Sequence, residues 1–427
     1  MIPEDIKRLN YIYYSSFRQF VKSPHSIFVC YMLFVLHLLK NIVCLRVRYK
    51  TIKEVLFFVP SANNKKSVRT ILENLKLNNV SIWGTPKTDL PYTRFYFTSI
   101  QGLHLFHKLY KTSSTDDKRL IRQFALIFMN TYGVYKNFER IIAENPQLKL
   151  IVFSNDHINI CRCLIEVAEK HGIKTLYVQH ASITDKFPPL HFSYSFLDGK
   201  ESYEKYEKIG KISGKVFLTG SPRFDELYDF KGATKMYEIG VALNMRDSCD
   251  KVMELCKYLQ SHVSKSIIVR PHPQMGRLFD PLLFRKAGMD ISDSTQESSF
   301  FFLSKVKFLV ANESSIHLDA ALIGVPSLLF NFSSEKVCDW YSYIKNGMIQ
   351  VCDNYDDVVK VLKNRHGLPV ANIQYYNASF QTPIEGKVGC FIATFIERFF
   401  KGSETDALKF ISSVMENKKE YYAFRNL

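Results

Sequence analysis

Short apolar runs alternate with helix-like periodicities along most of the chain. Residues 54–60 form an apolar run, followed by a polar turn, a helical pattern over 68–77 and a second apolar run at 80–83. The periodicity over 118–143 predicts one long helix, and strand, helix and strand then return over 148–178. Because strands that alternate with helices at this spacing form parallel sheets covered on both faces, the pattern predicts a doubly wound α/β architecture.

The alternation is interrupted once, where the chain becomes polar around 222–236, and then starts again. The 427 residues are too many for one typical core, so two Rossmann-like doubly wound domains are the simplest prediction. The apolar periodicity near the C-terminus makes those helices candidates to return to the first domain. The predicted parts are a basic and apolar helical arm at 1–50, Rossmann-like domains at 51–225 and 226–385, and C-terminal helices at 386–427.

The N-terminal arm combines a short apolar segment with a surplus of basic residues. The run from Ile27 to Leu39 is apolar except for His37, and it is shorter than the roughly 20 residues that a bilayer-spanning helix needs. Residues 1–50 carry eight Lys or Arg against two acidic residues, a net charge of +6. This pattern fits a helix lying on the anionic inner face of the plasma membrane, and it fits equally a helix packed on the first domain.

The whole chain is basic, with 57 Lys and Arg against 41 Asp and Glu and a net charge of +16. Such a surplus favours an anionic partner, namely nucleic acid, a membrane surface or a phosphorylated substrate. No helix-turn-helix, zinc-finger or aromatic RNA-binding pattern is present, so we expect no nucleic-acid partner. The nine cysteines are scattered without a CxxC pair, which predicts neither disulfides nor a metal site and favours a reduced, cytoplasmic compartment.

The stretch 310–326 carries the most informative candidate chemistry. It has the pattern of a strand end, a turn with Ser314 and Ser315, a short helix, and a Gly-x-Pro turn into the next strand. The first N–H groups of a helix lack partners and carry partial positive charge, so this turn predicts a phosphate site in which both serines cap the helix and contact the phosphate. Asp319, further along the same helix, is a candidate acceptor for ribose hydroxyls. Together these features indicate a nucleotide.

A second rigid turn, Arg270-Pro-His272-Pro, follows the predicted strand 266–269. Its two prolines restrict the backbone, so Arg270 and His272 are held with little freedom. Arginine can bind two phosphate oxygens, and histidine can donate a proton to a leaving phosphate near neutral pH. The alternative is a proline-stiffened loop with a partly buried histidine, but the Ser-Ser helix start in the same domain favours the phosphate site.

The motif Gly220-Ser221-Pro-Arg223 follows the predicted strand 216–218, near the boundary between the domains. Glycine permits close approach of the backbone, and Pro222 suits the first turn of a helix. Gly220, Ser221 and Arg223 are therefore candidate contacts to the phosphate of a nucleotide donor. A hinge between the domains is the equally supported alternative.

Asp156 and His180 each follow a predicted strand of the first domain. Ligands of doubly wound sheets bind beyond the carboxyl ends of the strands, so each residue is a candidate general base that removes a proton from an acceptor hydroxyl. Asp156 also stands where the N-cap of the next helix is expected. We expect His157 and His317 to be structural, and Glu313 is left open.

Several phosphate- and metal-binding signatures are missing. The chain has no Gly-x-x-x-x-Gly-Lys-Ser/Thr loop, no Gly-x-Gly-x-x-Gly after a strand, no HExxH and no Asp-x-Asp. The sequence therefore gives no support to a kinase, a dinucleotide oxidoreductase or a metalloprotease. It predicts a protein that uses neither a metal nor a cofactor.

Taken in order, five motifs resemble the series found in GT-B glycosyltransferases that build bacterial surface polysaccharides. The likeness is to the capsule-synthesis transferases and to the CDP-glycerol glycerophosphotransferase-like and polysialyltransferase-like groups. It covers roughly residues 150–330 and hardly touches the first 120. The motifs are Gln179-His180, Gly220-Ser-Pro-Arg223, Arg270-Pro-His-Pro273, Ser314-Ser315 and Asp319-Ala-x-x-x-Gly324-x-Pro326.

The resemblance implies an acceptor-binding N-terminal domain, a nucleotide-donor C-terminal domain and metal-independent transfer. It implies that His272, Ser314 and Ser315 contact the donor phosphate and that Asp319 contacts the ribose. This chain departs from the family at two of these motifs. The family often has Glu at the position of Asp319, and Gly at the position of Ala181.

The predicted protein is a cytoplasmic, peripherally membrane-associated glycosyltransferase. Its donor is a nucleotide sugar, with a CMP-activated acidic sugar favoured, and its acceptor is a surface polysaccharide or a lipid-linked glycan. The alternatives are transfer of a polyol phosphate from a CDP-alcohol, a UDP-sugar 2-epimerase, and a non-catalytic partner in glycan assembly.

Overall fold

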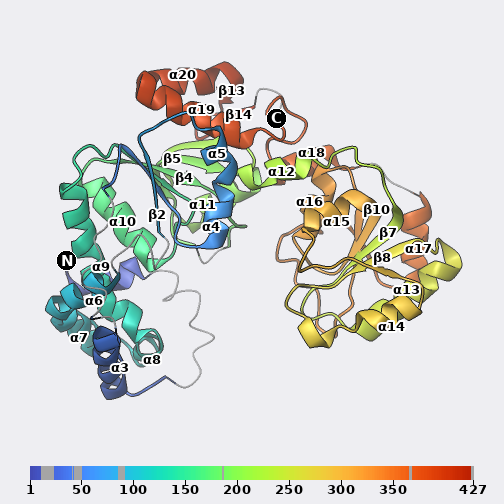
Figure 1. The fold of residues 1–427 in the computed structure, drawn as a ribbon, viewed down its shortest axis with the longest axis horizontal. Helices are drawn as coiled ribbons and strands as arrows, with labels where there is room; N and C mark the ends of the chain where they lie inside the picture. Colours follow the sequence, from blue (N-terminus) through green and yellow to red (C-terminus); the bar gives the residue numbers. More distant parts are fainter. Residues whose placement is uncertain are drawn as a thin grey trace. The chain divides into compact units, whose positions relative to one another are not determined.

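The structure is a computed structural model that describes residues 1–10, 24–40, 42, 51–84, 92–184, 187–364 and 368–424. The chain divides into two compact units. The first unit contains Met1–Arg223 together with Gly389–Leu427, and the second contains Phe224–Val388. Each unit has its own sheet (Figure 1). In the part of the chain that the structure describes, no helix is both long and apolar enough to cross a bilayer.

The sheet of the first unit has the strand order β13-β14-β6-β5-β4-β3-β1-β2 within the described residues. All neighbouring strands are parallel except β13 and β14, which form an antiparallel pair at one edge. The strands are β1 (Val55–Phe58), β2 (Val80–Trp83), β3 (Leu150–Phe153), β4 (Lys174–Val178), β5 (His191–Leu197), β6 (Ser213–Leu218), β13 (Met415–Asn417) and β14 (Tyr422–Phe424).

The central strands of this sheet are apolar on both faces. Every residue of β1 and β3 is buried, because helices cover both sides of a parallel sheet. The described helices of this unit are α1 (Pro3–Leu9), α3 (Ile27–Lys40), α4 (Ala62–Ser67), α5 (Arg69–Asn74), α6 (Tyr92–Ser99), the 3-10 helix η3 (Ile100–Gly102), α7 (Leu103–Thr112), α8 (Thr115–Gln123), α9 (Ala125–Ala143), α10 (Asn159–Lys170), α11 (Lys200–Ile209), α19 (Val388–Lys401) and α20 (Glu404–Val414).

The C-terminal segment belongs to the first unit. The ring of Phe395 in α19 lies 5.2, 5.3 and 5.8 Å, centroid to centroid, from Tyr194 and Phe196 of β5 and from Phe217 of β6. Beyond α20 the chain adds β14, in which Tyr422 pairs with Phe217. The sequence pattern predicted only helices here, and these two short edge strands are a correction.

The sheet of the second unit is parallel and has the order β12-β11-β10-β7-β8-β9 within the described residues. Its strands are β7 (Tyr237–Ala242), β8 (Ile267–Arg270), β9 (Asp290–Ile291), β10 (Val306–Ala311), β11 (Ser327–Phe330) and β12 (Gln350–Cys352). The described helices are α12 (Asp225–Tyr228), α13 (Cys249–His262), α14 (Pro281–Lys286), α15 (Ser299–Lys305), α16 (Ile316–Leu322), α17 (Tyr355–Asn364) and α18 (Val370–Tyr376), with the 3-10 helices η4 (Pro222–Phe224), at the boundary, and η5 (Gly276–Leu278).

Each sheet reverses its winding direction at one place. In the second unit the order runs outward from β7 through β8 on one side and from β10 through β11 on the other. In the first unit β1 and β3 occupy the equivalent positions. Loops after such neighbouring strands diverge and leave a crevice at the carboxyl ends, which is where doubly wound sheets bind ligands.

The α/β fold class that the sequence predicted is confirmed. The single helix predicted over 118–143 is wrong, because the chain leaves helical geometry at Phe124 (φ −112°, ψ 26°) between α8 and α9. The basic residues Arg18, Lys22, Arg46, Arg48 and Lys50 of the predicted arm lie outside the described residues.

Candidate functional site

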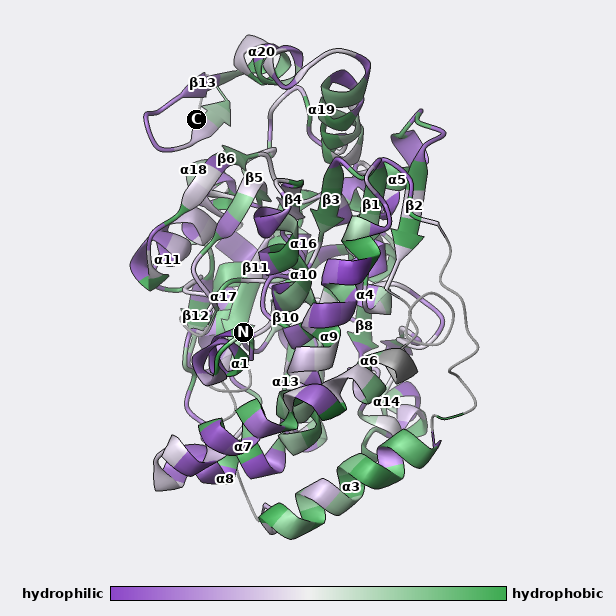
Figure 2. Cartoon of the chain, turned by 90° about the vertical axis from the view of Figure 1, so that its left-hand side faces the viewer, coloured by the Kyte–Doolittle hydropathy of each residue, from purple (hydrophilic) through white to green (hydrophobic). Residues whose placement is uncertain are grey.

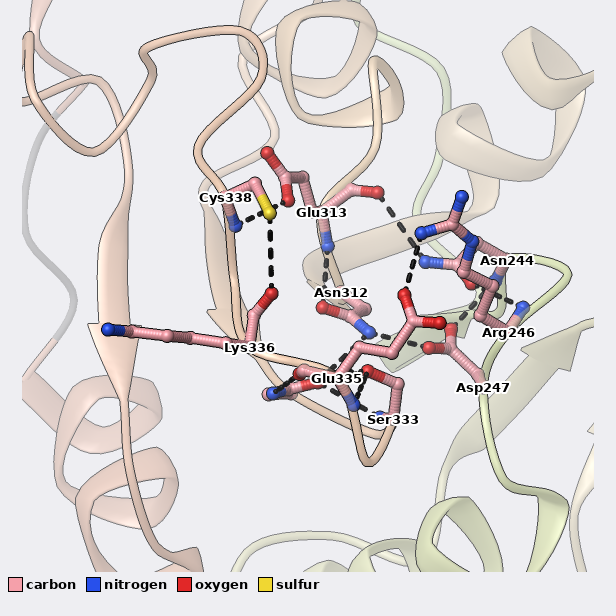
Figure 3. A network of polar contacts seen from close by, with 10 residues as sticks. Asn244, Arg246, Asp247, Asn312, Glu313, Ser333, Glu335, Lys336 and Cys338 are labelled. Carbon is pink, nitrogen blue, oxygen red and sulfur yellow. Dashed lines mark hydrogen bonds and ion pairs between the residues drawn. The ribbon is translucent and has the colours of Figure 1, made fainter. Parts of the chain in front are cut away.

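A network of side-chain amides and carboxylates occupies the switch point of the second unit (Figure 3). Asn312, directly after β10, donates from its amide to Asp247 at 2.6 Å and to Asn331 at 3.2 Å. The other oxygen of Asp247 accepts the backbone N–H of Asn244, the second residue after β7, at 2.7 Å. Burial raises the pKa of Asp247, and the hydrogen bonds from Asn312 and Asn244 oppose that shift. The network joins the ends of β7, β10 and β11.

Glu313 fixes the segment that borders this network. Its carboxylate accepts the backbone N–H of Cys338 at 3.1 Å and that of Trp340. Figure 3 shows the Glu313 carboxylate directed at Cys338, whereas Lys336 extends away from the other side chains. Glu313 therefore positions the 338–340 backbone. The sequence had left the role of Glu313 open.

His317 contacts the backbone of Asn312, a member of the network, and is fully buried. Its Nε2 is 3.1 Å from the carbonyl oxygen of Asn312, and its Nδ1 is 2.9 Å from the hydroxyl of Ser327. A carbonyl only accepts, so Nε2 carries the proton and Nδ1 accepts from the serine. Burial lowers the pKa of His317 to about 4. His317 thus holds the end of β10 in place, in agreement with the structural role expected for it.

His317 makes the stability of the protein sensitive to acid. The pKa of about 4 in the folded state lies below the roughly 6.5 of an unfolded histidine, so the unfolded chain takes up the proton first. The stabilisation is complete above pH 6.5 and is lost as the pH falls to 4, by roughly 3 kcal/mol. Urea unfolding at both pH values should show a smaller pH dependence in His317→Gln than in the wild-type protein. Identical dependence in both proteins would contradict this assignment.

A cavity of about 300 Å³ opens beside the network. This volume is at the lower end of small-molecule sites. The residues lining it come from the loops after β7, β8, β10 and β11, and they are Asn244, Met245, Arg246, His272, Asn312, Glu313, Asn331, Ser333, Glu335, Lys336, Val337, Cys338, Trp340 and Tyr341. We call it the switch-point cavity.

His272 is the one predicted site residue that lines the switch-point cavity. Its Nδ1 accepts the backbone N–H of Gln274 at 3.2 Å, within the Arg-Pro-His-Pro turn. In the neutral ring this leaves the proton on Nε2, where it can be donated to a ligand oxygen. The rigid turn therefore sets both the position and the tautomer of the histidine.

The other predicted donor contacts of this unit, Arg270, Ser314, Ser315 and Asp319, are not among the residues that line the cavity. Arg270, the last residue of β8, is buried and donates to the Ser292 hydroxyl and to the Glu297 carbonyl, both at 2.8 Å. Burial lowers the pKa of Arg270, and the acidic Glu297 opposes that shift. The guanidinium thus links β8 to the segment before α15, and its role toward a donor stays a prediction.

The predicted Ser-Ser cap is only half present. Ser314 Oγ accepts the backbone N–H of Ile316 at 3.3 Å, whereas Ser315 occupies the N-cap position without a capping hydrogen bond and is exposed. Asp319 lies in the first turn of α16 and is partly buried. No member of this group is among the residues lining the switch-point cavity, and their donor contacts stay predictions.

In the first unit, Asp156 follows β3 and is buried at the corresponding switch point. One carboxylate oxygen lies 2.9 Å from Nδ1 of His157, and the other accepts the hydroxyl of Tyr206 at 2.6 Å. Burial alone would raise the pKa of Asp156, but the hydrogen bonds from His157 and Tyr206 outweigh it, and the pKa is lowered. The N-cap alternative for Asp156 is wrong, because the N-cap of α10 is Ile158 and it has no side-chain cap.

His180, after β4, lies next to this pair. The rings of His157 and His180 are 5.5 Å apart, and the side-chain amide of Asn155 lies 3.4 Å from Nε2 of each. Burial lowers the pKa of His180 to about 4, although the charge of Asp156 opposes the shift. Nδ1 of His180 is buried and has no hydrogen-bond partner among the residues that the structure describes. The structure therefore brings together both general-base candidates that the sequence predicted.

The Gly220–Arg223 motif faces the end of β5. Gly220, two residues after the end of β6, adopts φ 79°, a conformation that favours glycine. Arg223 Nη2 lies 3.9 Å from a carboxylate oxygen of Asp198. The pKa of Asp198 is raised to about 7. Burial is the main cause, and the charge of Arg223 and the nearby Ser221 hydroxyl only partly oppose it. The donor-contact and hinge interpretations of the motif both stay predictions.

Sequence reasoning missed three features of these sites. The contact between the His157 ring and the buried carboxylate of Asp156, its neighbour in sequence, was not predicted, and the expected structural role of His157 is not tested by it. Asp198 directly follows β5. Its place at a strand end, like that of Asp156, could have marked it as a candidate site residue. The pair formed by Asp247 and Asn312 joins residues 65 positions apart, so no local pattern marks it.

No protein-family model matches the sequence, and no curated protein matches it either. Among solved structures, the UDP-GlcNAc 2-epimerase from Methanocaldococcus jannaschii is similar, with 12% identity, a TM-score of 0.50, and coverage of 80% of this chain and 99% of that one. The glycotransferase of kitacinnamycin has 10% identity, a TM-score of 0.49 and coverage of 81% and 98%. The wall teichoic acid polymerase TagF has 12% identity, a TM-score of 0.47 and coverage of 88% and 99%. At these identities the likeness concerns the fold alone: the chain has a GT-B fold, as its sequence predicted.

Proposed function

We propose that the protein is a metal-independent glycosyltransferase that takes a sugar from a nucleotide donor. The observation that carries this proposal is the switch-point cavity. It lies at the carboxyl ends of β7 and β10, most of the residues lining it have polar side chains, and one of them is a histidine of fixed tautomer. A GT-B fold is compatible with several chemistries, so the proposal rests on the residues of the cavity and not on the fold.

In the proposed reaction His272 acts on the leaving phosphate of the donor. Cleavage of a sugar–phosphate bond builds negative charge on the phosphate oxygen, and an Nε2–H donor stabilises that charge or transfers a proton to it. Ser314 is a further candidate contact, and Trp340 lines the same cavity with an indole that can stack on the nucleobase. A cytidine nucleotide is our first candidate, following the motif series in the sequence.

We propose that the first unit supplies the general base through Asp156 and His157. A carboxylate behind an imidazole orients the ring and stabilises the positive charge that forms when the ring takes up a proton. His157 has this support directly, at 2.9 Å, whereas burial opposes a positive charge on His180. Asp156 then acts by positioning His157, and His180 is the alternative acceptor of the proton. The acceptor substrate is a glycan hydroxyl, on a polysaccharide or a lipid-linked chain.

Titration calorimetry with CMP, CDP and UDP tests nucleotide binding. We expect binding of at least one nucleotide, and Trp340→Ala should weaken it about tenfold through loss of stacking. Trp340 is 70% exposed, so its truncation should leave the fold intact, and Met236→Ala, at 67% exposure in the same unit, is the matched control. Absence of binding by the folded wild-type protein would refute the proposal. Turnover of a UDP-sugar to its 2-epimer without an acceptor would instead identify an epimerase.

A further inference from the structure

Helix α3 carries apolar side chains on both of its faces. On the inner face, Cys30, Phe34 and Leu38 recur at every fourth position and are buried. They pack in one core cluster with Phe106 of α7 and Ile121 of α8. This stripe fixes the helix on the first unit. Packing within the unit therefore explains the apolar residues of the inner face only.

The outer face of α3 is a second apolar stripe that the described structure leaves exposed. Large apolar side chains occur there at helical spacing, and they are Phe28, Met32, Val35, Leu36 and Leu39. Figure 2 shows α3 as hydrophobic along most of its length, at the end of the unit where α7 and α8 also lie. A helix that is apolar all round requires an apolar environment on its outer side as well.

Basic residues lie at one end of this stripe and on the two helices packed next to α3. Lys40 is exposed at the C-terminal end of α3, and Lys108, Lys111 and Arg119 are exposed on the neighbouring helices α7 and α8. Together α7 and α8 carry five Lys or Arg against two Asp, a net charge of +3. An exposed apolar stripe on a basic group of helices is complementary to the acyl chains and headgroups of an anionic bilayer. A second copy of the chain would instead bring like charges together.

We propose that the outer face of α3, from Phe28 to Leu39, lies in the surface of an anionic membrane with the helix axis parallel to the bilayer. The 14 residues of α3 span about 21 Å, a length suited to lying in the interface. Phe28, Leu36 and Leu39 enter the acyl boundary, and the basic residues of α7 and α8 contact lipid phosphates. This proposal does not depend on the proposed enzymatic function.

Vesicle co-sedimentation of the full-length protein tests the membrane proposal. We expect binding to vesicles of phosphatidylcholine with 30% phosphatidylserine, weak binding to phosphatidylcholine alone, and loss of binding as salt rises from about 0.1 to about 1 M. The triple variant Phe28→Ser, Leu36→Ser, Leu39→Ser removes side chains that are 69, 56 and 59% exposed. It should bind about 1,000-fold more weakly, because each of the three apolar side chains contributes about tenfold.

The matched control is Leu282→Ser, Leu283→Ser on α14 of the second unit. These side chains are 60 and 57% exposed, and Arg285 and Lys286 follow them in the same helix. The control should bind vesicles as the wild type does, and circular dichroism should show unchanged melting for both variants. The proposal is overturned if the wild type ignores anionic vesicles, if the control loses binding as strongly as the triple variant, or if the triple variant changes only the oligomeric state in sedimentation velocity.

Discussion

Replacing Asp156 by asparagine is expected to lower turnover by about 10³-fold or more while leaving nucleotide affinity unchanged. We expect the asparagine oxygen to keep accepting from Tyr206, which turns its NH₂ group toward Nδ1 of His157, where the carboxylate oxygen lay at 2.9 Å. Nδ1 then becomes the acceptor and Nε2 carries the proton. The ring can no longer take a proton from an acceptor hydroxyl, and the measurement is kcat with the calorimetric Kd for the nucleotide.

Two companion variants separate orientation of the base from simple loss of packing. Tyr206→Phe removes the 2.6 Å hydrogen bond to Asp156 but leaves the contact with His157, so its turnover should fall by no more than about tenfold. His180→Ala removes the neighbouring ring. If His180→Ala abolishes turnover and Asp156→Asn is as active as the wild type, His180 is the base and the proposed pairing is wrong.

His272→Ala is expected to lower kcat by about 10³-fold, in the middle of the range for loss of a general acid. The nucleotide Kd should change by less than about tenfold, because the donated hydrogen bond strengthens only as charge builds on the leaving phosphate. With a sugar donor whose leaving group is more acidic, the loss of kcat in His272→Ala should be smaller, because that leaving group needs less stabilisation by a proton donor.

Arg246→Ala is the matched control for His272. Arg246 lines the same cavity, but its side chain is exposed and paired at 2.7 Å with Glu335, so its removal should change kcat only slightly. A His272→Ala variant with wild-type kcat and a strongly weakened Kd would show that the histidine only binds the ground state. Equal losses in both variants would point to collapse of the cavity and contradict the proposed role.

The sequence predicted the elements of both units well, because the buried strands of a parallel sheet are continuous apolar runs. Val55–Phe58 and Leu150–Phe153 are examples, with every residue buried. The prediction failed where stability comes from distant partners. Strand β14 (Tyr422–Phe424) is three residues long and joins the sheet through Phe217, far earlier in the sequence, and through its antiparallel partner β13. The break at Phe124 likewise has no proline or glycine to mark it.

The candidate site shows the same difference between features that a local sequence pattern predicts and features that depend on distant partners. His272 was identified because two prolines around it are visible in the sequence, and the turn they stiffen does line the cavity. Arg270 belongs to the same motif, but its guanidinium donates to Ser292 and Glu297. Neighbours in sequence thus have different surroundings, because a side chain at a strand end can face either the crevice or the next strand.

The sequence by itself determined the α/β class, the alternation of its elements and the positions of the polar strand ends, since these depend on local periodicity and turn chemistry. Only the tertiary structure decided that Asp247 meets Asn312, that Asp156 contacts both His157 and Tyr206, and that α3 buries one apolar stripe and exposes the other. The physical reason is the parallel sheet. It brings the carboxyl ends of distant strands to one edge, and the packing of the helices then fixes which side chains meet there.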